Sequence, residues 1–399
     1  ALVDAVVEMR RFPDDALLET RARQGLLQEA EIERLARRLA RFHDAAEIAR
    51  GSGGAAAMRR VLSLAAESLR GAPPAPSENI DAHLDRLSAL LERRAALLDA
   101  RDARGCTRHG HGDLTLRNIC LFEGEPTPFD CIEFSDALAK IDTLYDLAFL
   151  LMDLWRLGLE NLANVALNRY LDARDEADGL PLLPFFMSLR ATIRAHVAVS
   201  QEKMEEARED FALARELARE APPLVVAVGG FSGSGKSSVA AALAPLIGAP
   251  PGARTLNSDR LRKTLFGAEP NERLPQEAYA SAVSVKVYAQ MIDEARRVAA
   301  SPWPVVVDAV FDKEEARQEI EAAAKRAGAP FLGVWLDAPL EARLERVDAR
   351  KGDPSDATRD VLLRQMRGET GAIEWLRLDA ARPAAEIAEE IAARASYEG

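Results

Sequence analysis

The sequence predicts a two-part α/β protein, in which a mostly helical region precedes a domain built on a five-stranded parallel sheet flanked by helices. The chain has 399 residues, which suits two domains better than one. Apolar residues repeat every three or four positions through most of residues 14–220. After Ala221-Pro222-Pro223, short apolar runs alternate with amphipathic helices, the pattern of a parallel sheet covered by helices. We therefore expect domains at 1–221 and 222–399.

Composition excludes several classes of protein. Apolar residues make up 48% and charged residues 29%, which is a globular mixture. The net charge of -12 argues against a general nucleic-acid coat, because phosphate binding needs a basic surface. The three cysteines lack the spacing of a zinc site, and an odd number does not suit a disulfide framework. No run of 18 apolar residues occurs, so we expect a cytoplasmic protein that does not bind a membrane.

The first region combines helices with one β-rich segment. Two helical faces are clear, one formed by Ile32, Leu35, Leu39 and Phe42 and one by Leu84, Leu87, Leu91 and Leu98. Residues 119–134 are rich in strand formers, and Gly-Glu-Pro at 124–126 is the expected hairpin turn. Two long helices are expected at 143–173 and 182–220.

Five apolar runs in the second region predict its strands. They are LVVAVGG from residue 224, RTLNS from 254, PVVVDAVF from 304, PFLGVWLD from 330 and EWLRLD from 374. Each is short enough for a buried strand, and a helical pattern separates most of them.

The strongest motif follows the first of these runs. Residues 230–237 are GFSGSGKS and fit the phosphate-binding pattern G-x-x-x-x-G-K-[ST], between an expected strand at 224–228 and a helix at 237–246. Glycines let backbone N–H groups turn toward phosphate oxygens, and the helix N-terminus adds a favourable dipole. The alternative is a glycine-rich turn that binds nothing. We expect ATP here, held by Gly230, Ser232, Gly233, Ser234, Gly235, Lys236, Ser237 and Ser238.

Charged and polar groups near this loop indicate phosphoryl transfer. Lys236 would neutralise phosphate charge, and the Ser237 hydroxyl would ligate Mg²⁺. Asp259 follows the second strand and suits a general base for an acceptor hydroxyl. The alternative is a helix N-cap, with Ser258 as another candidate for the cap. Arg262 would hold an anionic substrate or lie on a solvated helix face.

Two further features complete this candidate site. Asp308 ends the third apolar run, where it would support Mg²⁺ or contact substrate, although any buried strand can end in Asp. Arg343, Arg346 and Arg350 share one helix face before a polar loop at 351–356, which suits a lid that closes over phosphates. The alternative is an exposed helix carrying ordinary ion pairs.

With these motifs, residues 222–399 resemble the P-loop kinases that phosphorylate small molecules or polynucleotides, related to gluconate kinase, zeta toxin, polynucleotide 5′-hydroxyl kinases and AAA-type kinases. The resemblance rests on GFSGSGKS, NSDRLRK, VVVDAVF and ARLERVDARKGDPSDA and covers the whole region. It implies that Asp259 is the base, that Arg346 and Arg350 are lid arginines, and that the acceptor is a hydroxyl.

A second motif lies in the helical region. Residues 111–118, HGDLTLRN, fit H-x-D-x-x-x-x-N, with His111 at its start. The spacing places Asp113, for a substrate hydroxyl, and Asn118, for a metal, on one loop, and Asp130 after a short strand would hold Mg²⁺. The alternatives are a metal cluster that includes His109, or a purely structural loop.

Residues 2–220 resemble the aminoglycoside-phosphotransferase and choline-kinase-like family, in the helical C-lobe of the protein-kinase fold. The resemblance implies that Asp146 is a structural acid. A kinase N-lobe also needs a strand lysine, but the first of the eight lysines is Lys140, beyond the motif. We therefore expect that the N-lobe is largely absent, either missing before Ala1 or lost in an inactive remnant, and that this site does not transfer phosphate efficiently.

Together these features predict an ATP- and Mg²⁺-dependent kinase whose partner is a small-molecule hydroxyl acceptor, such as a sugar, an aminoglycoside or a nucleotide-sugar. One alternative is a polynucleotide 5′-hydroxyl kinase, which the absence of a broad basic track does not favour. The other is a non-catalytic, ATP-gated regulator with a pseudokinase-like half.

Overall fold

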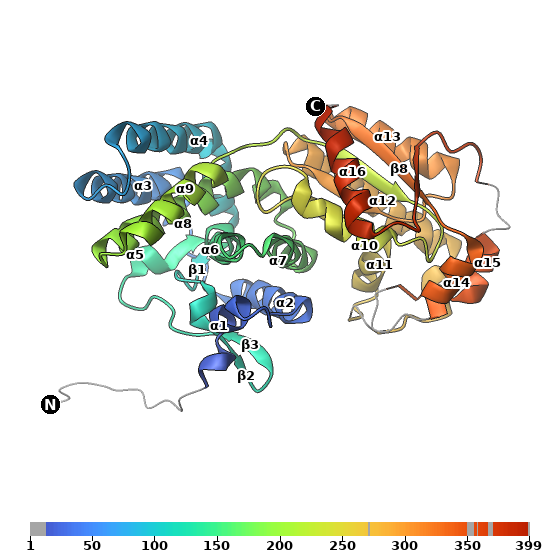
Figure 1. The fold of residues 1–399 in the computed structure, drawn as a ribbon, viewed down its shortest axis with the longest axis horizontal. Coiled ribbons are helices and arrows are strands. Elements are labelled where there is room, and N and C mark those ends of the chain that lie inside the picture. Colours follow the sequence, from blue (N-terminus) through green and yellow to red (C-terminus); the bar gives the residue numbers. More distant parts are fainter. Residues whose placement is uncertain (1–12, 270–271, 349–354, 357, 366–369, 398–399) are drawn as a thin grey trace. The chain divides into compact units, whose positions relative to one another are not determined.

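A computed structural model describes residues 13–269, 272–348, 355–356, 358–365 and 370–397 (Figure 1). The chain forms two compact units. Unit 1 comprises Ala1–Ala173 and Leu189–Asp210, and unit 2 comprises Arg174–Ser188 and Phe211–Gly399. Residues 174–188 and 211–221 thus group with unit 2, while the domain boundary near residue 221 stays a prediction.

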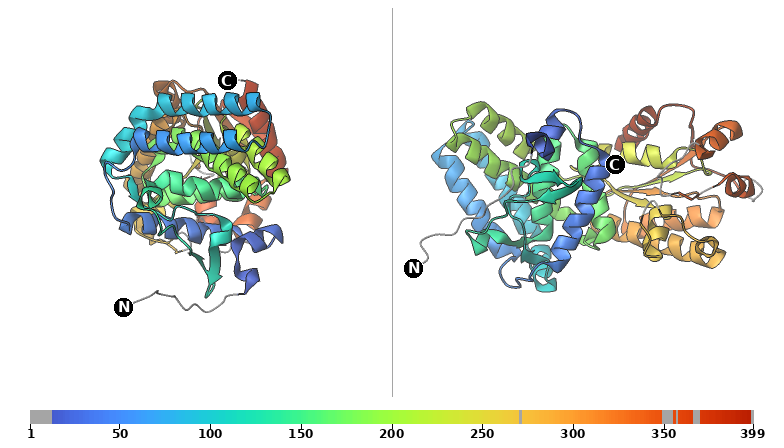
Figure 2. Two further views of the ribbon diagram at one scale, coloured as in Figure 1. Left: turned by 90° about the vertical axis from the view of Figure 1, so that its left-hand side faces the viewer. Right: turned by 90° about the horizontal axis from the view of Figure 1, so that it is seen from below.

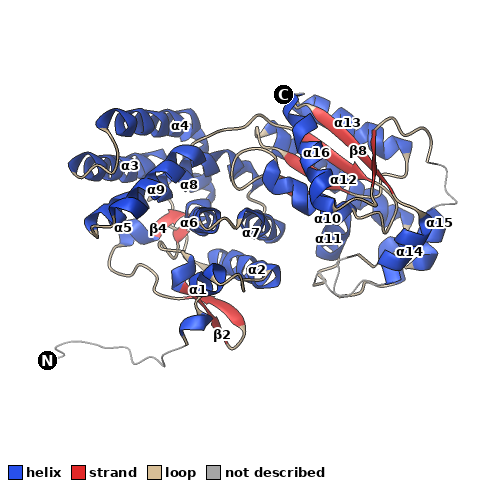
Figure 3. Ribbon diagram, viewed as in Figure 1, coloured by secondary structure: helices blue, strands red, loops and turns tan. Residues whose placement is uncertain are grey.

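Unit 1 is mostly helical, with two small antiparallel sheets (Figure 3). Its helices are η1 (Asp14–Ala16), α1 (Leu18–Arg23), α2 (Glu29–Ala45), α3 (Gly54–Gly71), α4 (Ser77–Arg104), η2 (Leu116–Asn118), α5 (Asp136–Ala139), α6 (Thr143–Arg156) and α7 (Glu160–Ala173). The strands β1 (Thr107–His109) and β4 (Lys140–Asp142) pair, as do β2 (Ile119–Phe122) and β3 (Glu125–Pro128). Helices α8 (Leu183–Ser200) and α9 (Met204–Leu217) contribute residues to both units.

The core of unit 1 is centred on α6, which is buried from Thr143 to Leu154. Helix α6 packs on α7, α7 packs on α2, and α3 packs on α4. The apolar positions predicted to face inward on α2 and α4 are buried, except Phe42, which is 40% exposed. The strand-like segment at residues 2–12 lies outside the described residues.

Three details of unit 1 differ from the sequence prediction. The turn between β2 and β3 is Glu123-Gly124, not Gly-Glu-Pro, because both turn residues have positive φ and Pro126 lies inside β3. The helix expected at 143–173 breaks at Gly158, where φ is 71°. The helix expected at 182–220 breaks near Glu202, where φ is 61°. A left-handed residue ends each helix because it cannot continue the right-handed spiral.

Unit 2 is a five-stranded parallel sheet with helices on both faces, as the sequence predicts (Figure 2). The strand order is β6 (Arg254–Asn257), β7 (Val305–Asp308), β5 (Val225–Gly229), β8 (Phe331–Asp337) and β9 (Leu376–Asp379). The helices are η3 (Ala177–Leu182), α10 (Lys236–Leu243), η4 (Ala244–Leu246), α11 (Ser258–Leu265), η5 (Gln276–Tyr279), α12 (Ser281–Ala300), α13 (Glu314–Ala327), α14 (Leu340–Asp348), α15 (Arg359–Gln365) and α16 (Ala384–Tyr397).

The sheet register places the site. Val228 of β5 and Asn257 of β6 both pair with Asp308 of β7, so these three strands end at one edge. One face of the sheet packs Val226, Val306 and Val334 against apolar side chains of α10 and α16. Because the carboxyl ends of parallel strands meet at this edge, the loops that follow them gather around one opening.

One described helical stretch, Ala177–Ser200, is long and apolar enough to cross a membrane by length and composition alone. Within its most apolar window 72% is buried in the protein, which is typical of a core helix.

Candidate functional site

The predicted phosphate loop connects β5 to α10 in unit 2. Gly233 and Gly235 have φ of 82° and 88°, in the left-handed region that glycine adopts without strain. A Cβ atom at Gly233 would lie 2.5 Å from the Arg343 carbonyl oxygen, so this close approach requires glycine. Gly235 caps α10, an eight-residue helix that begins at Lys236. The loop therefore aims backbone N–H groups and a helix N-terminus at one point, as anion binding requires.

Several polar groups of this loop suit a phosphate ligand. Ser234 Oγ is buried and has no hydrogen-bond partner among the described residues. Lys236 Nζ donates to the Phe231 carbonyl oxygen at 3.2 Å. The Ser232 amide donates to Gln365 Oε1 at 3.0 Å, so an α15 side chain reaches the loop. The buried Ser234 hydroxyl and the tight glycine backbone fit the phosphate chain of ATP.

The candidate metal ligands lie where the register brings β6 and β7 together. Asn257 Nδ2 donates to Asp308 Oδ2 at 2.6 Å and to Ser237 Oγ at 3.4 Å. Burial raises the pKa of Asp308. The Lys236 charge and the hydrogen bonds with Ser237 and Asn257 act in the opposite direction but do not outweigh burial. The Ser237 hydroxyl and the Asp308 carboxylate are oxygen ligands, which Mg²⁺ prefers. This donor set fits Mg²⁺.

Asp259 faces the same cavity as the loop. The cavity has a volume of about 1090 Å³, and its lining includes Lys236, Ser237, Asp259 and Asp308. The N-cap of α11 is Asn257, whose side chain accepts a hydrogen bond from the Arg260 amide at 2.9 Å. The alternative of Asp259 or Ser258 as the cap is therefore wrong, and Asp259 lies in the first turn of the helix.

The structure excludes one of the two interpretations of Arg262. This side chain is buried, donates to the Ala278 carbonyl oxygen at 2.6 Å, and lies 4.9 Å from the Tyr279 ring centroid. The interpretation that Arg262 lies on a solvated helix face is therefore wrong. Arg262 lines the cavity and positions η5 beside Asp259.

Two of the three predicted lid arginines lie near the phosphate loop. Arg346 donates to the Ala380 carbonyl oxygen at 2.8 Å and to that of Gly233 at 3.5 Å, and it lines the cavity. Arg343 is buried with its guanidinium carbon 5.3 Å from the Phe231 ring centroid. The alternative that Arg343 lies on an exposed helix face is therefore wrong. Arg350 lies outside the described residues.

A contact that the sequence did not reveal connects Asp356 to the other wall of the cavity. The Asp356 carboxylate accepts hydrogen bonds from Lys263 Nζ at 3.1 Å, the Leu274 amide at 3.0 Å and the Tyr279 hydroxyl at 2.5 Å. Burial raises the pKa of Asp356, but these three donors outweigh it and the net shift is downward. Asp356 thus holds the segment that leads into η5.

In unit 1 the predicted loop brings its acid and amide together. Asn118 Nδ2 donates to the Asp113 carboxylate at 2.8 Å, and Arg117 donates to it at 2.9 Å. Asp113 and Asp130 line a second cavity, and Asp130 has a left-handed φ of 59°. The described residues contain no group of three or more His, Cys, Asp or Glu side chains suited to a metal ion, the alternative involving His109 included.

Asp146 fixes the start of this loop. Its carboxylate accepts the His111 amide at 2.7 Å and the Gly112 amide at 2.9 Å, and His43 Nε2 lies 3.2 Å away. Burial raises the pKa of Asp146. The His43 hydrogen bond and the charges of His43, Arg190 and His111 together outweigh burial and lower the pKa to about 2. The resemblance of unit 1 to a phosphotransferase C-lobe stays a prediction.

Asn257 and Asp356 lie in motifs that the sequence shows, but the sequence indicated no role for either, and no motif included Gln365. Asn257 had a usable signal, because it ends a strand that precedes a helix. Gln365 and Asp356 had none, since their partners Ser232 and Tyr279 are 133 and 77 residues away.

Unit 2 is similar to one known domain family and to solved kinase structures. Residues 225–370 match the AAA domain family. A gluconokinase from Sinorhizobium meliloti is 26% identical, covering 45% of this chain and 94% of its own, with a TM-score of 0.32. The APS kinase of Mycobacterium tuberculosis is 24% identical, covering 43% of this chain and 96% of its own, also with a TM-score of 0.32.

Two mycobacterial relatives match nearly the whole chain. They are the uncharacterized proteins Rv2004c of Mycobacterium tuberculosis and Mb2027c of Mycobacterium bovis. Each is 30% identical over 401 residues, which covers 95% of this chain and 78% of the relative. The chain therefore belongs to the same family as these mycobacterial proteins.

Proposed function

We propose that unit 2 transfers the γ-phosphate of ATP to a hydroxyl group of a small molecule. The observation that carries this proposal is a single cavity. It is lined by the phosphate loop, by the Ser237, Asn257 and Asp308 cluster, and by the Asp259 carboxylate. A phosphate-binding loop alone would suit any nucleotide protein, whereas an acid facing that loop suits transfer to a hydroxyl.

Each group has a separate task in this proposal. The loop amides and Lys236 hold the phosphates, and Arg346 adds positive charge beside Gly233. Mg²⁺, held by Ser237 and Asp308, would supply charge stabilisation when bound. Asp259 accepts the proton of the acceptor hydroxyl as that oxygen attacks the γ-phosphorus in line and the bond to ADP breaks.

The acceptor side of the cavity carries hydroxyl groups. Tyr279, Ser281, Ser284 and Tyr288 all line it. Burial raises the pKa values of Tyr279 and Tyr288, so both phenols are neutral and serve as hydrogen-bonding groups. Asp259 is therefore the better base, and the lining suits an acceptor with several hydroxyls, such as a sugar, an aminoglycoside or a nucleotide-sugar.

The test is a transfer screen with γ-labelled ATP and Mg²⁺ against sugars, aminoglycosides, nucleosides, nucleotide-sugars and oligonucleotide 5′ ends. We expect a hydroxylated small molecule to be labelled. Lys236→Ala should lower turnover on the order of 100-fold or more, because it removes charge that stabilises the transferring phosphate. Lys286→Ala is the matched control, since Lys286 is exposed on α12.

Three results would contradict the proposal. Full turnover in Lys236→Ala would exclude this loop as the active site. Labelling of oligonucleotide ends alone would favour a polynucleotide kinase. ATP binding without transfer to any acceptor class would favour an ATP-gated regulator.

A further inference from the structure

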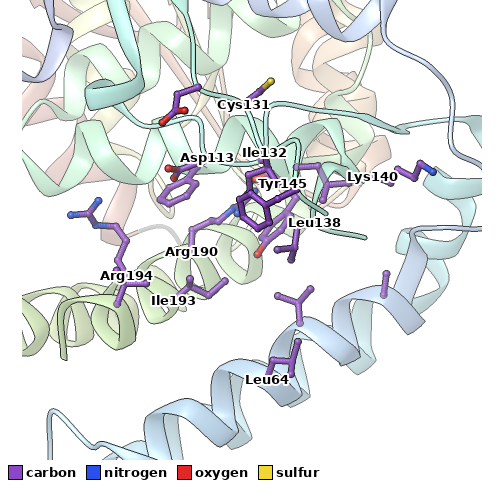
Figure 4. A pocket seen from close by; sticks show the side chains of 18 of the residues that line it. Leu64, Asp113, Cys131, Ile132, Leu138, Lys140, Tyr145, Arg190, Ile193 and Arg194 are labelled. Carbon is purple, nitrogen blue, oxygen red and sulfur yellow. Dashed lines mark hydrogen bonds between the residues drawn. The ribbon is translucent and has the colours of Figure 1, made fainter. Parts of the chain in front are cut away.

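Unit 1 contains a large cavity with a mostly apolar wall (Figure 4). Its volume is about 880 Å³, within the range of small-molecule sites. Aliphatic side chains come from α3, from α8 and from the segment before β4; they include Met58, Val61, Leu64, Ile132, Leu138 and Ile193. Leu64 is 61% exposed although it lines this wall. The wall can therefore cover the apolar part of a ligand.

One buried cation in this lining, Arg190, forms no ion pair with a described residue. Arg190 extends from α8 into the cavity in Figure 4 and is 7% exposed. Its guanidinium carbon lies 3.8 Å from the Tyr145 ring centroid and 4.7 Å from that of Phe149. Nε donates to the Tyr145 carbonyl oxygen at 3.2 Å, but Nη2 is buried without a hydrogen-bond partner among the described residues.

The other cations of the lining show what is unusual about Arg190. Arg117 lies 2.9 Å from Asp113 and Lys140 lies 2.7 Å from Asp136. Arg194 and Lys203 lie 3.3 and 3.8 Å from Glu206. Arg60 has no described partner, but it is exposed to water. Among the cations of this lining, Arg190 is thus the buried one that forms no ion pair with any described residue.

The acids near Arg190 do not fill this role. The Arg190 charge contributes to lowering the pKa of Asp146, but the two side chains form no ion pair. The Asp146 carboxylate already forms hydrogen bonds with His43 and two backbone amides. Asp130 and Glu133 line the cavity but are exposed. A buried guanidinium without an anion is costly, because burial removes its hydration. An anionic ligand would restore the missing interactions.

We propose that the unit 1 cavity binds an amphipathic organic anion. The carboxylate or phosphate group of the ligand pairs with the Arg190 guanidinium, whose planar donors match either oxyanion. Its apolar body packs against α3 and α8. This site lies wholly within unit 1, so its ligand need not be the acceptor of the proposed transfer.

The test measures binding to the full chain by calorimetry, with four ten-carbon ligands. Decanoate and decyl phosphate carry the two candidate anions, decanol is neutral, and decylamine is cationic. We expect at least one anion to bind more tightly than decanol, and decylamine to bind most weakly. The better of the two anions identifies the headgroup.

Variants locate the two parts of the site. Arg190→Met keeps the apolar stem and should weaken the anion roughly tenfold or more while leaving decanol unchanged, because only the charged pair is lost. Arg60→Gln is the matched control on an exposed cation and should change neither affinity. Leu64→Ser changes an exposed wall position and should weaken both ligands alike.

Four outcomes would overturn this inference. They are the absence of anion binding, tighter binding of decylamine than of both anions, equal binding of the better anion by Arg190→Met and the unchanged protein, and equal binding of that anion by Leu64→Ser and the unchanged protein. Circular dichroism checks that each variant is folded. If Arg190→Met does not fold, the four ligands on the unchanged protein and the Leu64→Ser variant still test whether the cavity binds an amphipathic anion.

Discussion

Each unit contains a carboxylate that accepts a hydrogen bond from an asparagine, yet the surroundings of the two pairs differ. In unit 2, Asn257 bonds Asp308 at 2.6 Å. In unit 1, Asn118 bonds Asp113 at 2.8 Å. The Asp308 pair lies beside Ser237 and the N-terminus of α10. The Asp113 carboxylate instead accepts a second hydrogen bond, from Arg117.

A carboxylate that accepts a hydrogen bond from an asparagine side chain does not by itself make a transfer site. In the proposed function, unit 2 has separate groups for the phosphates, namely the loop amides, Lys236 and Arg346, which line its cavity. In the described part of unit 1, Arg117 neutralises the acid itself and Lys140 is paired with Asp136. The phosphate loop that opens α10 with Lys236 has no counterpart among the described residues around Asp113, and we expect catalysis from unit 2.

The largest effect should come from the acids of the two units. Asp259→Asn should lower phosphate transfer on the order of 100- to 10,000-fold, because the amide cannot accept the acceptor proton. Asp113→Asn, the matched change in unit 1, should leave ATP turnover unchanged. Steady-state kinetics with a labelled acceptor measure both. A large loss in Asp113→Asn would show that unit 1 also takes part.

A second effect concerns the stability of unit 1. Asp146→Asn should lower the free energy of unfolding by about 3 kcal/mol, because it breaks the buried pair with His43 and leaves an amide N–H of the loop without its acceptor. Denaturant unfolding followed by circular dichroism measures this change. Asp136→Asn, in an exposed pair with Lys140, should leave stability unchanged. Equal stability of both variants would refute the role of Asp146.

The same carboxylate predicts a pH dependence. The pKa of Asp146 is lowered to about 2 from 3.8, so its stabilisation is complete above pH 3.8 and is lost as the pH falls through 2. The loss should amount to roughly 2 kcal/mol, and Asp146→Asn should remove this part of the acid sensitivity. Unfolding curves between pH 5 and about pH 2 measure it. An equally steep acid loss in the variant would assign it to other groups.

The smallest effect should come from Asp356 of unit 2. Asp356→Asn weakens the contacts with Lys263 and Tyr279 that hold the segment before η5. We expect KM for the acceptor to rise about fivefold, which corresponds to roughly one hydrogen bond, with kcat almost unchanged. A fall in kcat at constant KM would instead place Asp356 in the chemistry.

Local patterns predicted the sheet and the phosphate loop well. The strands at 225–229 and 305–308 and the loop at 230–237 each have their signal within a few residues. The cap of α11 was harder, because Asn257, Ser258 and Asp259 are all good caps and only the backbone selects Asn257. The sequence did not single out Arg190, because the rings of Tyr145 and Phe149 that it contacts come from another helix, α6. Contacts of this kind depend on packing that no local pattern contains.

The pairing of Asn257 with Asp308 across β6 and β7 has a consequence for how this protein can change over evolutionary time. Because the two residues are register partners, the spacing of the strands fixes their separation. Insertions in the loops that follow the strands would reshape the acceptor side and leave this pair in place. In the proposed function, such insertions would change the acceptor and keep the Asn257–Asp308 pair, whereas a one-residue slip within either strand would separate the pair.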